Sequence, residues 1–223
     1  MTAAKKTVLI TGATGALGSA VLARYQRAGQ PIVALHHGEA PGQAAGDVRW
    51  VRANVTDPAS MHQALQGLSV DQLVHCAGGF RFAHADQTSD QDLDFLLGTN
   101  LRSAFYLVRE LLPGMKERNY GRLVFVSSRQ TMAPGAGMAA YAASKAGLNA
   151  LVSSLAEETK KHDINVNAVL PTVIDTPANR RDMPKADISQ WVSTESLAEI
   201  IFSLTDAWGK PMNGALVPVA GRL

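Results

Sequence analysis

Short apolar, β-branched runs alternate with longer segments of helical periodicity along almost the whole chain. The apolar runs predict seven strands, at residues 7–11, 31–35, 48–51, 71–77, 121–126, 164–170 and 215–219. Helices are expected between them, from the turn after the first strand to residue 28, from Asp57-Pro58 onward, and at 90–116, 139–161 and 195–204. Strands separated by helices are typical of a parallel sheet that helices cover on both faces. We therefore expect one α/β domain over residues 1–223, a doubly wound, seven-stranded parallel sheet.

Composition narrows the classes of protein without pointing to a special surface. The chain has 223 residues and a formal net charge of +2, with its basic residues scattered, which does not favour nucleic acid as a partner. Its single cysteine, Cys76, excludes an internal disulfide and suits a reducing compartment. No apolar run approaches the roughly 20 residues of a membrane span, and residues 1–6 are too polar for a secretory signal. A cytoplasmic protein with no membrane contact is expected.

The first strand runs directly into a glycine-rich turn, Gly12-Ala13-Thr14-Gly15-Ala16-Leu17-Gly18, and then into a helix. Small residues let the backbone approach a pyrophosphate, and the free N–H groups at the start of the helix can bind it. A glycine turn alone is weak evidence, but the strand and helix around it make nucleotide binding the better interpretation. We therefore predict a Rossmann-type nucleotide-binding domain.

The end of the second strand carries His36 and His37, where such domains meet the adenosine ribose. An acid there suits the 2′-hydroxyl of NAD, and a basic residue suits the 2′-phosphate of NADP. With histidines and no carboxylate at the tip, the sequence favours NADP over NAD. Neighbouring residues of a strand face opposite ways, so at most one of the two should line the site. The histidines of the chain lack the spacing of metal ligands, and no metal site is predicted.

A phenol and an ammonium group are expected side by side on the helix that begins near residue 139. Tyr141 and Lys145 are four residues apart, which places them on one helical face. An adjacent cation favours the phenolate and lowers the pKa of a tyrosine toward neutral pH, where it can act as acid or base. Most Tyr–Lys pairs at this spacing are only solvated neighbours, so the pair needs support from the rest of the chain.

That support is a set of motifs in a fixed order, through which the chain resembles the short-chain dehydrogenases/reductases over nearly its full length. Besides the glycine turn they are Asn54-Val55, Ala77-Gly78, Asn100, Ser128, the Tyr141-x-x-x-Lys145 pair, and Pro171 with Thr176. Ser128 precedes Tyr141 by thirteen residues, the usual spacing in that family.

The resemblance implies a catalytic role for four residues. Tyr141 would exchange a proton with the substrate oxygen while the nicotinamide exchanges hydride. Lys145 would hold the nicotinamide ribose and lower the tyrosine pKa. Ser128 would donate a hydrogen bond to the same oxygen. Asn100, an amide in an otherwise apolar helix, would hold a water that links Lys145 to solvent.

The resemblance also implies a path for the cofactor. The glycine turn would hold the pyrophosphate, Asn54 and Val55 would flank the adenine, and Ala77 and Gly78 would lie along the cofactor. Ile174 and Thr176, which follow Pro171, would meet the carboxamide. Departures from the family pattern are Ala16 in place of a glycine, Asn54 in place of an aspartate, Cys76 in place of an asparagine and Thr172 in place of a glycine.

The long segment 172–192 is the only long irregular region expected, and it has a narrower likeness. Together with the Ala77–Phe80 stretch it is similar to the same region of quinonoid dihydropteridine reductases. Those enzymes characteristically carry an acid at the second strand's tip and lack the serine, whereas this chain has Ser128 and no such acid. The segment is either a lid, with Phe80, Met183 and Trp191 as substrate-wall residues, or a mobile connection that the tryptophan anchors.

Three functions are compatible with these motifs. The first is an NAD(P)(H)-dependent oxidoreductase acting on the carbonyl or alcohol of a small molecule. The second is a pteridine reductase like the dihydropteridine reductases. The third is a non-catalytic regulator that senses NADP, against which the complete Ser128, Tyr141 and Lys145 set argues. The resemblance further implies a homodimer or homotetramer built on the helices at 90–116 and 139–161.

Overall fold

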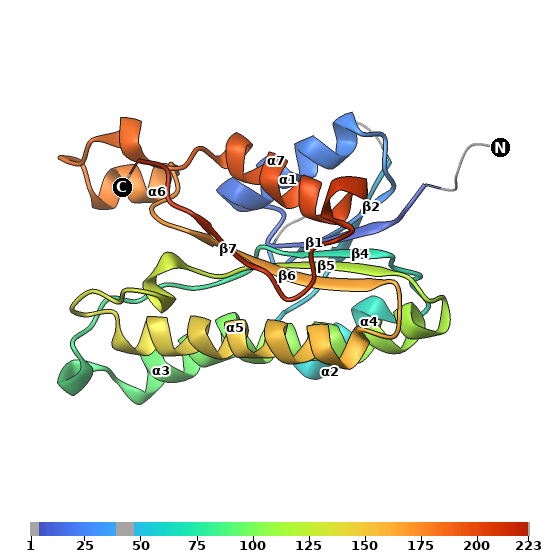
Figure 1. Cartoon of the computed structure of the whole chain (residues 1–223). Helices are drawn as coiled ribbons and strands as arrows, with labels where there is room; N and C mark the ends of the chain where they lie inside the picture. The colour runs from blue at the N-terminus through green and yellow to red at the C-terminus, as the bar shows by residue number, and fades with distance from the viewer. Residues whose placement is uncertain (1–4, 39–46, 223) are drawn as a thin grey trace.

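A single seven-stranded parallel sheet forms the centre of the molecule (Figure 1). The computed structural model describes residues 5–38 and 47–222. The strands are β1 (Val8–Thr11), β2 (Ile32–His36), β3 (Val48–Arg52), β4 (Gln72–His75), β5 (Gly121–Val126), β6 (Ile164–Pro171) and β7 (Leu216–Val219). Their order across the sheet is β3-β2-β1-β4-β5-β6-β7, and every neighbouring pair is parallel. The predicted fold class and all seven predicted strands are confirmed, with ends that shift by one or two residues.

The order of the strands places a ligand site at one edge of the sheet. The chain leaves β1 toward β2 on one side, and β4 pairs with β1 on the other side. At such a switch point the connections diverge, and a crevice opens beyond the carboxyl ends of the strands. The glycine turn after β1 and the Ala77-Gly78 segment after β4 both lie at this edge.

Helices cover both faces of the sheet, as expected (Figure 1). Helices α1 (Ala16–Arg27) and α7 (Thr194–Thr205) cover one face, and α2 (Pro58–Leu65), α4 (Ser103–Glu117) and α5 (Ala139–Thr159) cover the other. Two hydrophobic cores result, one on each side, because the strand residues are buried alternately toward α1 and α7 and toward α4 and α5. None of the helices within the described ranges has the length and apolar character needed to cross a membrane.

The helix expected at 90–116 is not a single regular helix. It consists of α3 (Asp90–Leu97), a π-helical turn at Gly98–Arg102 and α4. Asn100 lies in the middle of the π turn, fully buried. π turns inside α-helices are frequent at functional sites, and a polar residue in an apolar helix was the only sequence sign of this one.

The segment 172–192 is more ordered than the sequence predicts. It contains α6 (Pro177–Asp182), a 3-10 turn at Ile188–Gln190, and a parallel bridge between Ile174 and Val192. Thr176 caps α6 by accepting a hydrogen bond from the backbone N–H of Asn179, and a proline follows at the first helical position. The expectation of a long irregular region is therefore wrong, because capping residues and the bridge give the segment structure of its own.

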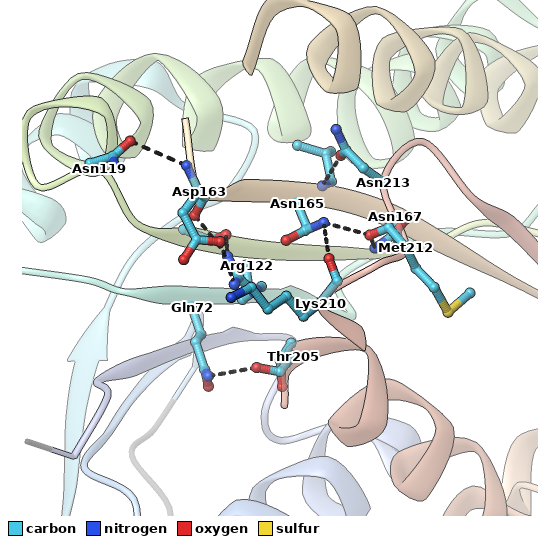
Figure 2. Close-up of polar contacts among 12 residues, drawn as sticks. Gln72, Asn119, Arg122, Asp163, Asn165, Asn167, Thr205, Lys210, Met212 and Asn213 are labelled. Carbon is cyan, nitrogen blue, oxygen red and sulfur yellow. Dashed lines mark hydrogen bonds and ion pairs between the residues drawn. The ribbon is translucent and has the colours of Figure 1, made fainter. Parts of the chain in front are cut away.

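Amide and charged side chains hold the opposite, amino-terminal edge of the sheet together (Figure 2). Asn165 and Asn167 of β6 both donate hydrogen bonds to the carbonyl of Met212, at 2.7 and 2.9 Å. Arg122 of β5 forms a 2.7 Å ion pair with Asp163, and its side chain is only 5% exposed. The two asparagines fix the chain that leads from α7 into β7, and the ion pair ties β5 to the turn before β6. All of these contacts lie away from the edge that carries the predicted site.

Candidate active site

The glycine turn is packed so closely that two of its glycines, Gly12 and Gly18, leave no space for a side chain. Gly12 has a φ of +64°, and a Cβ there would lie 2.8 Å from the backbone nitrogen of Ala77. A Cβ on Gly18 would lie 2.0 Å from the carbonyl oxygen of Gly12. Gly15, by contrast, has an ordinary φ of −79° and begins α1 with no side-chain cap. The first N–H groups of α1 therefore have no capping side chain and can bind an anion.

A pocket of about 400 Å³ adjoins this turn. Seven of the predicted cofactor residues line it, namely Gly12, Thr14, His36, His37, Asn54, Val55 and Ala77. The structure adds Leu35, Ala53, Thr56, Phe95 and Thr99, which no sequence motif identified. The lining fits a nucleotide, since it combines small residues such as Gly12 and Ala77 with apolar side chains such as Leu35 and Phe95. The residues present therefore fit NAD(P).

His36 and His37 both line this pocket, so the expectation that at most one would do so is wrong. The His36 ring is 8% exposed, packs edge-on against Trp50 with 6.1 Å between centroids, and donates from Nδ1 to the carbonyl of Gly38 at 3.0 Å. One of the two ring nitrogens of His36 therefore already has a hydrogen-bond partner within the protein. The exposed His37 also lines a second pocket.

That second pocket, of about 470 Å³, is basic. It shares His37, Ala53 and Asn54 with the first, and Arg49 and Arg52 add two guanidinium groups. Among the residues that the structure describes, no Asp or Glu lines either pocket. A cationic surface beside the adenosine end of the first pocket suits a phosphate better than a free ribose hydroxyl.

Ser128 and Tyr141 meet at the carboxyl edge of the sheet. Ser128 follows β5 and is 6% exposed, and Tyr141 lies in the first turn of α5. Burial raises the pKa of the Tyr141 phenol, and a hydrogen bond with the Ser128 side chain lowers it, with burial the larger effect. The phenol is therefore protonated at neutral pH.

Lys145 is held by the backbone of β5, and its predicted effect on the tyrosine pKa stays a prediction. Its ammonium group is buried and donates to the carbonyl of Val126 at 2.8 Å, so this cation is satisfied by the backbone of β5. Burial lowers the pKa of Lys145 itself to about 8. Tyr141 and Lys145 share a helical face, as the four-residue spacing predicts.

Asn100 joins the π turn to the segment after β4 and to α5. Its Oδ1 accepts from the backbone N–H of Gly79 at 2.8 Å, and its Nδ2 donates to the carbonyl of Gly79 and to Ser144 Oγ, each at 3.0 Å. A Cβ on Gly78 would lie 3.0 Å from Asn100 Oδ1 and 3.2 Å from Lys145 Nζ. The amide thus has protein partners on both sides. Its predicted role as a water ligand stays a prediction.

His75 connects β4 to β1 and to α4, because both of its ring nitrogens make hydrogen bonds to side chains of these elements. Its Nδ1 pairs with Thr11 Oγ1 at 2.7 Å, and its Nε2 pairs with Ser103 Oγ at 3.0 Å. Because Ser103 Oγ donates to the carbonyl of Thr99 at 2.6 Å, it can only accept from His75, which assigns the proton to Nε2. Burial, with a smaller effect from Lys145, lowers the pKa of His75 to about 3. No sequence motif indicated this role.

Acid should destabilise the protein through His75. Its pKa falls from 6.5 unfolded to about 3 folded, so the unfolded state binds more protons below pH 6.5 and stability decreases as the pH falls toward 3. Between pH 7 and pH 4.5 we expect a loss on the order of 2.5 kcal/mol in the free energy of unfolding from this group. Urea unfolding of His75→Gln should show that much less pH dependence than the wild type. An unchanged pH dependence in His75→Gln would contradict the assignment.

The predicted carboxamide residues lie outside both pockets. Pro171 ends β6, the carbonyl of Ile174 accepts from Asn179 Nδ2 at 2.8 Å, and the Thr176 hydroxyl caps α6. The Ile174 carbonyl and the Thr176 hydroxyl therefore already have protein partners. Their role toward the cofactor stays a prediction.

The three candidate substrate residues differ in their surroundings. Phe80 is 50% exposed, and its ring meets that of Tyr141 edge-on with 5.1 Å between centroids. Met183 is 36% exposed. Trp191 is only 8% exposed, which favours the alternative in which it anchors the segment 172–192. Phe82, two residues beyond Phe80 along the chain, is 60% exposed with its ring against Gly137, and it was not predicted.

Comparisons with known proteins agree with this geometry. The family model for short chain dehydrogenases matches residues 6–187. The 3-oxoacyl-[acyl-carrier-protein] reductase FabG of Escherichia coli is 32% identical over 185 residues, covering 78% of this chain and 76% of that protein. The acetoacetyl-CoA reductase of Allochromatium vinosum is 28% identical, covering 96% and 97%.

Solved structures show the same fold over the whole chain. A short chain dehydrogenase/reductase family protein superimposes with a TM-score of 0.92 at 25% identity, covering 99% of this chain and 98% of its own. An oxidoreductase of the same family from Burkholderia thailandensis gives a TM-score of 0.88 at 29% identity, covering 99% and 93%. These findings support neither the dihydropteridine reductase interpretation nor the sensor interpretation.

Proposed function

Since the chain belongs to the short chain dehydrogenase family and is an NAD(P)-dependent oxidoreductase, we propose that it reduces the ketone of a 3-oxoacyl thioester, with Tyr141 as the proton donor. The observation that carries this proposal is the pairing of the buried Ser128 hydroxyl with the Tyr141 phenol at the edge of the sheet that also holds the nucleotide pocket. The substrate class is suggested by the two relatives whose names specify 3-oxoacyl and acetoacetyl-CoA reductases.

The cofactor, when bound, supplies a hydride to the substrate carbon. The protein supplies the groups that receive the developing negative charge on the substrate oxygen. Ser128 donates a hydrogen bond to that oxygen, and Tyr141 transfers its proton to it. The raised pKa of Tyr141 keeps the phenol protonated at neutral pH, which is the state that reduction requires.

Other residues hold the nucleotide. Gly12 and Gly18 would let the backbone approach the pyrophosphate, and the free N–H groups at the start of α1 would bind its charge. Lys145 would hold the nicotinamide ribose, a role supported by the position of its Nζ, 3.2 Å from where a Cβ on Gly78 would lie. His37, with Arg49 and Arg52 in the adjoining basic pocket, favours NADPH over NADH.

Phe80 is exposed with its ring against Tyr141, and Phe82 is exposed two residues further along. We assign both to the wall that contacts the acyl chain. The family is typically oligomeric. We infer a homodimer or homotetramer with α4 in the interface. Phe105 of α4 is 46% exposed and belongs to neither hydrophobic core of the described residues, so a second subunit could cover it.

Turnover of a 3-oxoacyl thioester tests the proposed function. Purified protein should oxidise NADPH in the presence of acetoacetyl-CoA, with kcat/KM about tenfold higher for NADPH than for NADH, a difference of about 1.4 kcal/mol. The His37→Asp variant should reverse the preference, because a carboxylate repels the 2′-phosphate and accepts from the 2′-hydroxyl. Turnover of simple ketones but not of acetoacetyl-CoA would contradict the substrate class, and no NAD(P)H oxidation with any ketone would contradict the function.

A further inference from the structure

Ser128 is held in place by a single helical turn. The 3-10 turn Arg129–Thr131 follows it directly, and Ser128 Oγ accepts from the backbone N–H of Gln130 at 3.2 Å. The Ser128 carbonyl accepts twice from Thr131, from its N–H at 3.1 Å and from its hydroxyl at 2.8 Å. The backbone and the side chain of the serine are therefore both fixed by the turn.

This turn is fastened to the helix that carries Tyr141. Asn149 of α5 donates from Nδ2 to Thr131 Oγ1 at 2.9 Å. Asn149 follows Lys145 by four residues and Tyr141 by eight, so it lies on the same side of α5, about two turns along. A chain of hydrogen bonds runs from Asn149 through the Thr131 hydroxyl to the Ser128 carbonyl. It connects the end of β5 to α5 independently of Tyr141.

An asparagine at position 149 is less favourable for the stability of the fold than an apolar residue would be. Its Oδ1 is buried and makes no hydrogen bond with any residue that the structure describes. An unpartnered buried carbonyl oxygen destabilises a fold, and an apolar side chain of similar size would avoid that loss. Residues that reduce stability while supporting a site are a common sign of a functional constraint.

We propose that Thr131 and Asn149 are positioning residues, which set the Ser128 hydroxyl at the distance and angle from Tyr141 that the reaction needs. This inference rests on the proposed roles of Ser128 and Tyr141. Neither Thr131 nor Asn149 belongs to the motifs that identified the site. Their contribution is to hold two elements, the end of β5 and α5, in a fixed relation.

The Thr131→Val variant tests the proposal directly, since it keeps the shape of the side chain and removes the hydroxyl. We expect kcat to fall by about tenfold or more, because small misplacements of catalytic groups have large effects, while KM for NADPH stays unchanged. Thr131→Ser should restore most of the activity. In the direction of alcohol oxidation, the rising limb of the pH profile should move to higher pH in Thr131→Val, because Ser128 lowers the pKa of Tyr141.

The Asn149→Leu variant separates positioning from a structural role. We expect its kcat to fall by several-fold while its melting temperature is equal to or above that of the wild type, since the unpartnered Oδ1 is removed. A parallel fall in melting temperature and kcat, with no shift of the pH profile, would instead indicate an ordinary structural contact and overturn the proposal.

Thr88→Val is the matched control. Thr88 also closes a 3-10 turn with its hydroxyl, which donates to the carbonyl of His84 at 3.0 Å, and it is half-buried like Thr131. It should keep wild-type kcat and pH profile. Wild-type kinetics in both Thr131→Val and Asn149→Leu, together with an inactive Ser128→Ala, would overturn this inference alone. An active Ser128→Ala would overturn the proposed function as well.

Discussion

Replacing Tyr141 with phenylalanine is expected to lower kcat by about three orders of magnitude and to leave NADPH bound. A proton donor in the transition state contributes roughly 10²- to 10⁴-fold, and the variant removes that donor. The ring that packs against Phe80 is retained, so the shape of the site should be preserved. Steady-state kinetics with acetoacetyl-CoA give kcat, and calorimetric titration gives the dissociation constant of NADPH.

Tyr120→Phe is the matched control for this experiment. Tyr120 contributes the face of its ring to Lys6 and Arg122, with 4.0 and 4.6 Å from the cations to the centroid, and phenylalanine keeps that face. Its kcat should equal that of the wild type. Near-wild-type turnover in Tyr141→Phe would show that another group donates the proton, and loss of NADPH binding would show that the phenol is needed for the cofactor.

The second large effect is expected at Gly18, where alanine should weaken NADPH binding by at least about 100-fold, or 2.7 kcal/mol. The added Cβ would lie 2.0 Å from the carbonyl oxygen of Gly12 and 2.6 Å from its carbonyl carbon, both backbone atoms that cannot rotate away. The turn must open, and it loses the position in which it approaches the pyrophosphate. Overpacking of this kind should also lower the free energy of unfolding by about 1–3 kcal/mol.

Gly15→Ala is the comparison within the same turn. Its Cβ would meet only the Gly12 oxygen, at 3.3 Å, and its φ of −79° suits any L-residue. We expect NADPH binding within a few-fold of the wild type and little change in melting temperature. Similar losses in both variants would mean that the whole turn, rather than the contact between Gly18 and Gly12, determines binding.

The fold was accessible from the sequence because its strands are continuous apolar runs with clear ends. The predicted strand at 121–126 has the same first and last residues as β5. Its ends were clear because a glycine begins the apolar run and two serines follow it. Asp57-Pro58 likewise begins α2 as predicted, with the carboxylate capping the backbone N–H of Ala59. The order of the motifs also predicted that Ser128 and Tyr141 lie at the carboxyl edge of the sheet, where the structure has both.

The sequence could not predict contacts between side chains and elements that are distant along the chain. Lys145 donates to the carbonyl of Val126, a partner nineteen residues away on a strand that no local motif identifies. The bonds of Asn149 and His75 likewise join elements distant in the chain. α6 was missed because it is only six residues long and carries no apolar stripe.

The transfer of deuterium from NADPH that carries deuterium at both C4 positions of the nicotinamide tests the central claim most directly. Wild-type enzyme with acetoacetyl-CoA should give 3-hydroxybutyryl-CoA with one deuterium on the carbinol carbon, measured by mass spectrometry. Tyr141→Phe, saturated with the same cofactor, should give about a thousandth of that product per unit time. Unlabelled product from the wild type, or labelled product from Tyr141→Phe at the wild-type rate, would contradict the account.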